Sequence, residues 1–276
     1  MLEAKMQTLI ANARMYAVTP AIRDAWRALF DWASRRAGVP LVYVDHAAPA
    51  PLEELWSRGD LGATFMCGFP FALAMPRPLL VAAPIPAPPR YQHQALYCTD
   101  FVVRADSAFV RLRDTFGARI GWTVAHSQSG FNAPRHHLLA YRNGKSGPLF
   151  AASIGPLVTP RRVIEALLDG TIDVGPLDSY VHDLLKRHEP TTASRLRTIE
   201  STAMTPIPPL IASPATPADT VERLRATLLA AAADPETAPM LDELLLAGFA
   251  RGAAADYDRM PAQALEAAAA GYPVPG

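Results

Sequence analysis

The chain has 276 residues, which is enough for one large domain or for two lobes of ordinary size. Half of the residues are hydrophobic and 19% are charged, a composition that is ordinary for a folded protein and excludes disorder over the whole chain. The 26 basic residues balance the 26 acidic ones, so no overall field exists to hold a nucleic acid or an acidic membrane surface. Any charged ligand must therefore be recognised locally.

Export signals and cysteine frameworks are not apparent in the sequence. Cys67 and Cys98 are too few for a disulfide scaffold or a cysteine-ligated zinc site, and the scattered histidines predict no metal site and no cofactor. The N-terminal apolar stretch is broken by Asn12 and Arg14, so it lacks the continuous core of a signal peptide. No uncharged apolar run reaches the roughly 18 residues of a membrane-spanning helix. As written, the sequence predicts a soluble cytoplasmic protein without membrane insertion.

The first hundred residues alternate between short β-like runs and helical runs, as β-α-β units do. Thr19 and Pro20 supply an N-cap and a first helical residue, and Gly38 ends that helix. The predicted elements are a strand at 7–16, a helix at 20–37, a strand at 40–44, a short helix at 51–58 and a strand at 61–66.

A second β/α series follows a proline-rich stretch at 76–89 and a long extended segment at 95–104. Its predicted elements are a strand at 119–124, a turn at 126–130, a helix to about 141, a helix at 160–168, a strand at 172–174, a helix at 178–186, a strand at 195–200 and an extended segment at 206–213. The remainder is predicted to be helical, at 217–233 and 239–249. Strands joined by helical crossovers indicate two α/β lobes, each with a mostly parallel sheet.

The turn HSQSGFN carries the clearest binding signal. Ser127, Gln128, Ser129 and Gly130 lie where a predicted strand passes into a helix, which directs unpaired backbone N–H groups and the positive end of the helix dipole toward one point. Ser127 and Ser129 add hydroxyl donors, and Gly130 permits a close approach. This pattern predicts an anion site, although Ser127 could equally serve only as an N-cap.

A second polar group opens the helix after the predicted strand at 172–174. Asp178, Ser179 and Tyr180 stand at the carboxyl edge of the predicted sheet, where open α/β folds place ligands. This favours a binding role for the three residues. The alternative is that Asp178 only caps the helix.

Four residues of the first series are further candidates. Cys67 and Gly68 follow the strand at 61–66, and Tyr16 and Tyr97 lie near strand ends, where an aromatic ring can line a binding site or pack in the core. Cys67 has no neighbouring histidine or aspartate that would make it a nucleophile, so a small buried side chain is the simpler interpretation.

Together these motifs resemble the phosphate/phosphonate-binding group of type 2 periplasmic binding proteins, the solute receptors of ABC importers. The resemblance spans nearly the whole chain in order and spacing. The motifs that carry it are FMCGFPF (65–71), YCTDFVVRADS (97–107), HSQSGFNAPRHHL (126–138), VIEALLDGTIDVGPLDSYVHDLLKRHEP (163–190) and TPIPPLIAS (205–213).

The resemblance implies two α/β lobes joined by two crossover strands, with a small anionic ligand clamped between them. Lobe one would comprise 1–101 and 208–276, and lobe two 102–207. The segments 95–104 and 206–213 would run side by side as hinge strands. By the same likeness, residues 127–130 would meet the anionic group and residues 178–180 would supply opposite polar contacts. Cys67 and Cys98 are both expected in lobe one, without a disulfide between them.

A non-catalytic solute-binding protein is the leading functional hypothesis, with a phosphonate, a phosphate or a carboxylate as ligand. We expect a monomer that meets an ABC permease. A cytoplasmic enzyme on the same fold, similar to chorismate dehydratase, is the first alternative; it would need an acid or base such as Asp178 or His126. The second alternative is a ligand-sensing domain, which would need a partner to bind DNA because no basic helix-turn-helix is apparent.

Overall fold

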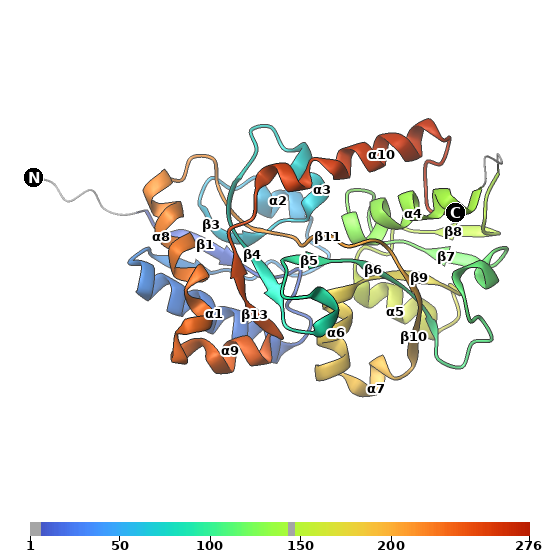
Figure 1. The fold of residues 1–276 in the computed structure, drawn as a ribbon, viewed down its shortest axis with the longest axis horizontal. Coiled ribbons are helices and arrows are strands. Elements are labelled where there is room, and N and C mark those ends of the chain that lie inside the picture. The colour runs from blue at the N-terminus through green and yellow to red at the C-terminus, as the bar shows by residue number, and fades with distance from the viewer. Residues whose placement is uncertain (1–6, 143–146) are drawn as a thin grey trace, which may run out of the picture. The chain divides into compact units, whose positions relative to one another are not determined.

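The chain divides into two structural units, which the computed structural model describes over residues 7–142 and 147–276 (Figure 1). The first unit comprises the residues up to Leu96 together with Pro206–Asp256, and the second comprises Tyr97–Thr205 together with Tyr257–Gly276. The N-terminal stretch that was considered as an export signal includes residues 1–6, which lie outside the described residues. No helix within the described ranges is both long enough and apolar enough to cross a membrane.

A six-stranded mixed sheet organises the first unit, in the order β13-β4-β12-β3-β1-β2. The strands β2, β1 and β3 are parallel neighbours, whereas β12 runs antiparallel to β3 and β4, and β13 runs antiparallel to β4. The strands are β1 (Leu9–Asn12), β2 (Leu41–Tyr43), β3 (Leu61–Phe65), β4 (Leu79–Pro86), β12 (Leu210–Ala212) and β13 (Leu246–Ala250).

Helix α1 (Pro20–Ala37) shows how the sequence sets local structure in this unit. The Thr19 hydroxyl accepts a hydrogen bond from the Ile22 amide at 3.2 Å, and Gly38 ends the helix with φ 60°. Its buried residues recur at helical spacing and pack toward α8. The predicted helix at 20–37 is thus confirmed. The other α-helices of this unit are α2 (Leu52–Trp56), α3 (Gly68–Leu73), α8 (Ala218–Leu229) and α9 (Ala238–Glu243).

The second unit contains an antiparallel sheet, β10-β6-β9, and a parallel pair, β7-β8, which an isolated bridge from Ile120 to Val174 connects. Its strands are β6 (Thr99–Arg104), β7 (Arg119–Gly121), β8 (Ala152–Ile154), β9 (Gly175–Asp178) and β10 (Leu196–Ser201). Its α-helices are α4 (Ala133–Arg142), α5 (Pro160–Leu168), α6 (Ser179–His188), α7 (Pro190–Ala193) and α10 (Arg259–Ala269).

Two short strands, β5 (Leu96–Tyr97) and β11 (Thr205–Pro206), pair where the chain passes between the units. The Ile207 amide extends this pairing by donating to the Ala95 carbonyl at 3.0 Å. The predicted hinge strands therefore run side by side only over these few residues. Beyond them β6 and β12 belong to different sheets.

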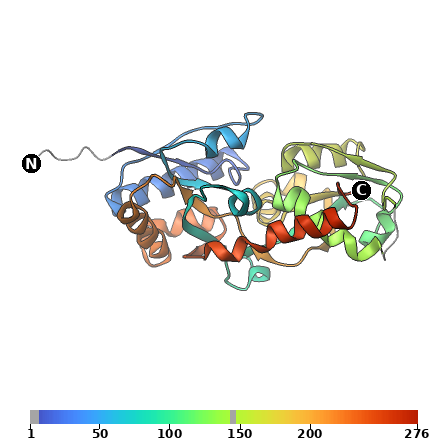
Figure 2. The ribbon, with the colours of Figure 1, turned by 90° about the horizontal axis from the view of Figure 1, so that it is seen from above.

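The C-terminal segment differs from the sequence prediction, which placed all of 208–276 in lobe one. Residues 257–276 group with the second unit, because Tyr272 packs into its core with Phe101, Ile120 and Leu138. Figure 2 shows α10 lying beside α4 in that unit. Cys98, expected in lobe one, also lies in the second unit.

Three further expectations need correction. The sheets are mixed rather than mostly parallel. The predicted helix at 239–249 ends at Glu243 and is followed by β13. The strand predicted at 172–174 lies instead at Gly175–Asp178, where it pairs with β6.

Candidate functional site

The turn predicted from the sequence lies at the start of a continuous helical run in the second unit. Ser127 has extended backbone and caps η3, a π-helical turn at Gln128–Asn132, which passes directly into α4. The Ser127 hydroxyl oxygen accepts a hydrogen bond from the Gly130 amide at 2.9 Å. Ser127 is therefore an N-cap, as one of the two interpretations of the sequence proposed.

The turn still has hydrogen-bond donors that are not used in capping the helix. The Ser127 hydroxyl accepts from Gly130 and keeps its own hydrogen, while the Ser129 carbonyl accepts from the Thr99 hydroxyl at 2.9 Å. Within the described ranges, neither the amide nor the hydroxyl of Ser129 donates to a protein group. Both serines are partly exposed. The turn thus presents two hydroxyl donors and one backbone donor at the positive end of a helix.

Gly130 is required for a reason other than ligand approach. A Cβ atom at this position would lie 1.9 Å from the Thr123 Oγ1 atom and 2.8 Å from its Cβ. The Thr123 amide also donates to the Gly130 carbonyl at 3.1 Å. The missing side chain lets the turn rest against the end of the segment that follows β7.

Gln128 was predicted to contact the ligand, but its side chain is fully buried. Its Nε2 atom donates to Gln263 Oε1 at 2.9 Å, and its Oε1 atom accepts from Asn132 Nδ2 at 2.8 Å. Both polar atoms of the buried Gln128 side chain are hydrogen-bonded, so this side chain stabilises the turn from the protein interior.

Asp178, Ser179 and Tyr180 lie at the junction of β9 and α6, and β9 packs against η3. Asp178 Oδ1 accepts from the amides of Tyr180 at 2.9 Å and Val181 at 3.1 Å, so the carboxylate caps α6. Ser179 is fully buried, and its hydroxyl accepts from the Cys98 amide at 3.0 Å.

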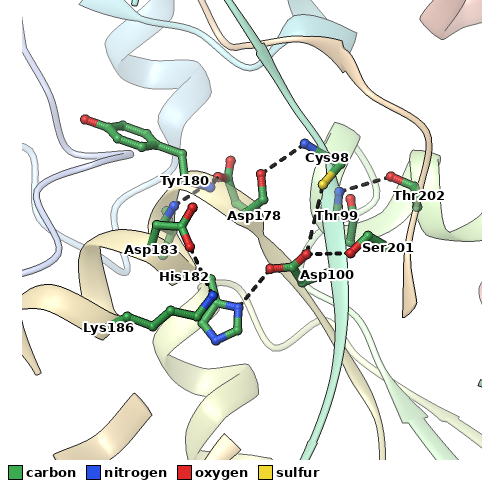
Figure 3. A network of polar contacts seen from close by, with 12 residues as sticks. Cys98, Thr99, Asp100, Asp178, Tyr180, His182, Asp183, Lys186, Ser201 and Thr202 are labelled. Atoms are coloured by element: carbon green, nitrogen blue, oxygen red, sulfur yellow. Dashed lines mark hydrogen bonds and ion pairs between the residues drawn. The ribbon is translucent and has the colours of Figure 1, made fainter. Parts of the chain in front are cut away.

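Tyr180 is also fully buried. Burial, and after it the negative charge of Asp178, raises the pKa of the Tyr180 phenol well above its ordinary value. The phenol therefore stays neutral. Figure 3 shows its ring directed away from Asp100 and His182.

Thr99 connects the two predicted motifs, and the sequence analysis did not single it out. It lies opposite Asp178 in the β6-β9 ladder, and its hydroxyl donates to Ser129. The Thr202 hydroxyl in turn accepts from the Thr99 amide at 3.0 Å. The only signal in the sequence was its position at the start of the crossover motif.

Asp100 and His182 form a buried pair that was also missed (Figure 3). His182 Nδ1 lies 2.9 Å from Asp100 Oδ2, and the Ser201 hydroxyl donates to Asp100 Oδ1 at 2.7 Å. The Cys98 Sγ atom lies 4.0 Å from the same oxygen. The pair joins β6, which carries Thr99, to α6, which Asp178 caps.

The remaining predicted residues are buried. Tyr16 stacks edge-to-face on Phe65 with ring centroids 4.9 Å apart, in the first unit. Cys67 and Gly68 lie at the start of α3 in the same unit, and Tyr97 belongs to β5 in the second. The two cysteines are free thiols. Among the residues that the structure describes, no group of three or more histidine, cysteine, aspartate or glutamate side chains could hold a metal ion.

Comparison with known proteins gives one family match. Residues 17–257 match the family described as ABC transporter, phosphonate, periplasmic substrate-binding protein. No curated protein sequence matches the chain.

Solved structures share the fold at low sequence identity. A PhnD1 protein from Prochlorococcus marinus in complex with methylphosphonate is 14% identical with a TM-score of 0.77, over 94% of this chain and 97% of that one. A binding protein component of an ABC phosphonate transporter from Pseudomonas aeruginosa is 15% identical with a TM-score of 0.73, over 96% and 97%. A Xanthomonas citri protein bound to ATP is 20% identical with a TM-score of 0.64, over 95% and 98%.

Proposed function

Since the chain belongs to the family of phosphonate-binding periplasmic substrate-binding proteins of ABC transporters, we propose that it is a non-catalytic receptor whose turn at Ser127–Gly130 binds the anionic group of a small solute. The ligand class comprises phosphonates, phosphate and carboxylates, which share oxygens that accept several hydrogen bonds. An ABC permease is the proposed partner. The clamp between two lobes stays a prediction from the family resemblance.

The observation that carries this proposal is the set of donors on Ser127 and Ser129 that find no acceptor among the residues the structure describes. Donors that are partly exposed, lie at a helix N-terminus and lack protein acceptors stabilise an anion without a fixed lysine or arginine. Asp178, on the neighbouring strand end, supports a ligand that carries a donor beside its anionic group, such as a hydroxyl or an amine.

The enzyme alternative receives less support. Asp178 is one of its two candidate acid or base groups, and this carboxylate accepts two helix amides. A carboxylate engaged in this way favours a capping role over proton transfer.

The test is calorimetric titration with methylphosphonate, inorganic phosphate, methanesulfonate and acetate. The Ser129→Ala variant removes one hydrogen bond to a charged group and is expected to weaken binding by roughly 1.5 to 3 kcal/mol, about tenfold to a hundredfold. Ser194→Ala, at an exposed position where α7 ends, is the matched control and should bind like wild type. Failure of every probe to bind wild type, or equal binding by Ser129→Ala, would contradict the proposal.

A further inference from the structure

A stripe of buried polar side chains connects the helical run of the turn to the C-terminal segment at 257–276. Its members recur at spacings of three, four and seven, so they share one face of the helix. All of them are at least nine-tenths buried. The stripe consists of Gln128, Asn132, Arg135 and Arg142.

Each member of the stripe bonds to the C-terminal segment. Asn132 Nδ2 donates to the Met260 carbonyl at 2.9 Å. Arg135 donates to the carbonyls of Ala264 and Pro273, both at 3.1 Å. Arg142 donates to the Ala270 carbonyl at 2.7 Å, beyond the end of α10.

Gln128 differs from the others because it donates to a side chain rather than to a backbone carbonyl. Its bond to Gln263 Oε1 joins the first residue of η3 to α10. Its bond to Asn132 spans the same π-helical turn, in which the Asn132 amide donates to the Ser127 carbonyl at 2.9 Å. Ser127 and Ser129 flank Gln128 in the chain, so all three residues share the backbone of this one turn.

From this geometry we infer that Gln263, on the C-terminal helix, is a positioning residue for the anion turn, acting through Gln128. The inference rests on the proposed function of that turn. Gln263 makes no contact with the ligand in this account. It holds the side chain of Gln128, which keeps the π-helical turn and the two serine hydroxyls in the geometry that an oxyanion needs.

The test compares three variants by calorimetric titration with methylphosphonate and inorganic phosphate. Gln263→Leu removes the acceptor for Gln128 and is expected to weaken binding about threefold to tenfold. Gln263→Glu keeps an acceptor oxygen at the same place and should stay within about twofold of wild type. Gln263→Ala replaces the leucine variant if leucine prevents folding.

Arg142→Met is the matched control, because it removes a bond to the same segment at the far end of the helix. It should lower the melting temperature while leaving both affinities within about twofold of wild type. A second readout needs no ligand: the Ser129 amide resonance should move in Gln263→Leu and stay in place in Arg142→Met.

The outcomes separate the two ideas. If Ser129→Ala weakens binding but Gln263→Leu binds like wild type, or if Arg142→Met weakens binding as much as Gln263→Leu does, the positioning role is wrong and the anion turn stands. If no probe binds wild type, or Ser129→Ala binds equally well, the anion turn is wrong and the positioning role falls with it.

Discussion

At the candidate site, the backbone of Gly130 packs closely against the side chain of Thr123. The Gly130→Ala substitution would place a Cβ atom 1.9 Å from Thr123 Oγ1, so one of the two segments must shift. We expect a loss of about 1 to 3 kcal/mol in the free energy of unfolding, as for other overpacking changes. Urea denaturation measures the loss.

Thr123→Ala supplies the partner variant for this prediction. Its Oγ1 atom is buried and has no hydrogen-bond partner among the described residues, so its removal should change stability little. In that background Gly130→Ala should cost less, because two of the three clashing atoms are gone. Equal costs in both backgrounds would show that the contact with Thr123 does not govern position 130.

The Arg119–Asp173 pair should make stability depend on pH. The Arg119 guanidinium bonds both carboxylate oxygens of Asp173, at 2.8 and 2.9 Å, and these bonds hold the pKa of Asp173 below its usual value. The stabilisation is therefore present above the unfolded pKa, about 3.9, and is lost as the pH falls through the lower folded value.

The measurement is a comparison of wild type with Asp173→Asn. Wild type should unfold at higher urea concentration than the variant at pH 7, and the difference should shrink as the pH is lowered below about 3.9. Arg119→Gln should remove only part of this pH dependence, because the backbone amide of residue 119 still donates to Asp173. A difference that is equal at pH 7 and pH 3 would contradict this account.

Among the elements, α6 allows capping to be separated from ligand binding at Asp178. Asn is as good an N-cap as Asp, whereas Ala is a poor one. Asp178→Asn should therefore keep the stability of wild type, and Asp178→Ala should lose about 1 kcal/mol. Thermal unfolding checks both values.

The same pair of variants tests the charge of Asp178. If this carboxylate lies beside the bound anion, Asp178→Asn removes a repulsion and should raise the affinity for methylphosphonate, which carries no amine or hydroxyl substituent. Unchanged affinity in Asp178→Asn, measured by calorimetry, would restrict the residue to its capping role.

The elements that sequence patterns missed were decided by tertiary pairing. The strand β4 contains Pro84 and Pro86, which normally argue against a strand in a sheet. Both lie in the part of β4 that pairs with β13 alone, since β12 pairs only with residues 79–82. The strand β13 resembles the alanine- and leucine-rich helices around it and becomes a strand because β4 offers it an edge.

The residues of the candidate site also fall into two groups, those that the sequence could predict and those that depend on tertiary pairing. The turn at Ser127 and the cap at Asp178 could be predicted, because hydroxyl and carboxylate residues at helix starts have local causes. Thr99, Asp100 and His182 could not, since their roles depend on the register of β6 against β9 and α6. Gln128 was expected at the anionic group by family likeness, and the partner to which its side chain donates, Gln263, lies 135 residues away in the chain.

For the whole molecule, the division into two units predicts which segments unfold together. His182→Leu removes the hydrogen bond between the His182 ring and the buried Asp100 carboxylate and should cost about 3 kcal/mol. Hydrogen exchange should then lose protection in 97–205 and in 257–276 together, while 7–96 and 206–256 keep theirs.

The peptide covering α10 decides this prediction. The sequence placed it with lobe one, and the structure groups it with the second unit. If its exchange follows 206–256 in His182→Leu, the C-terminal segment does not open with the second unit. Ser194→Ala serves again as the neutral control.

The chain passes between the two units three times, at Leu96–Tyr97, Thr205–Pro206 and Asp256–Tyr257. An even number of passages would return the last helix to the unit of the first, but an odd number leaves α1 and α10 in different units. Asp31 on α1 and Leu265 on α10 are both exposed and can each carry a fluorophore. Energy transfer between such labels would turn the protein into an optical sensor, because any solute that changes the spacing of the units would change the colour of the emitted light.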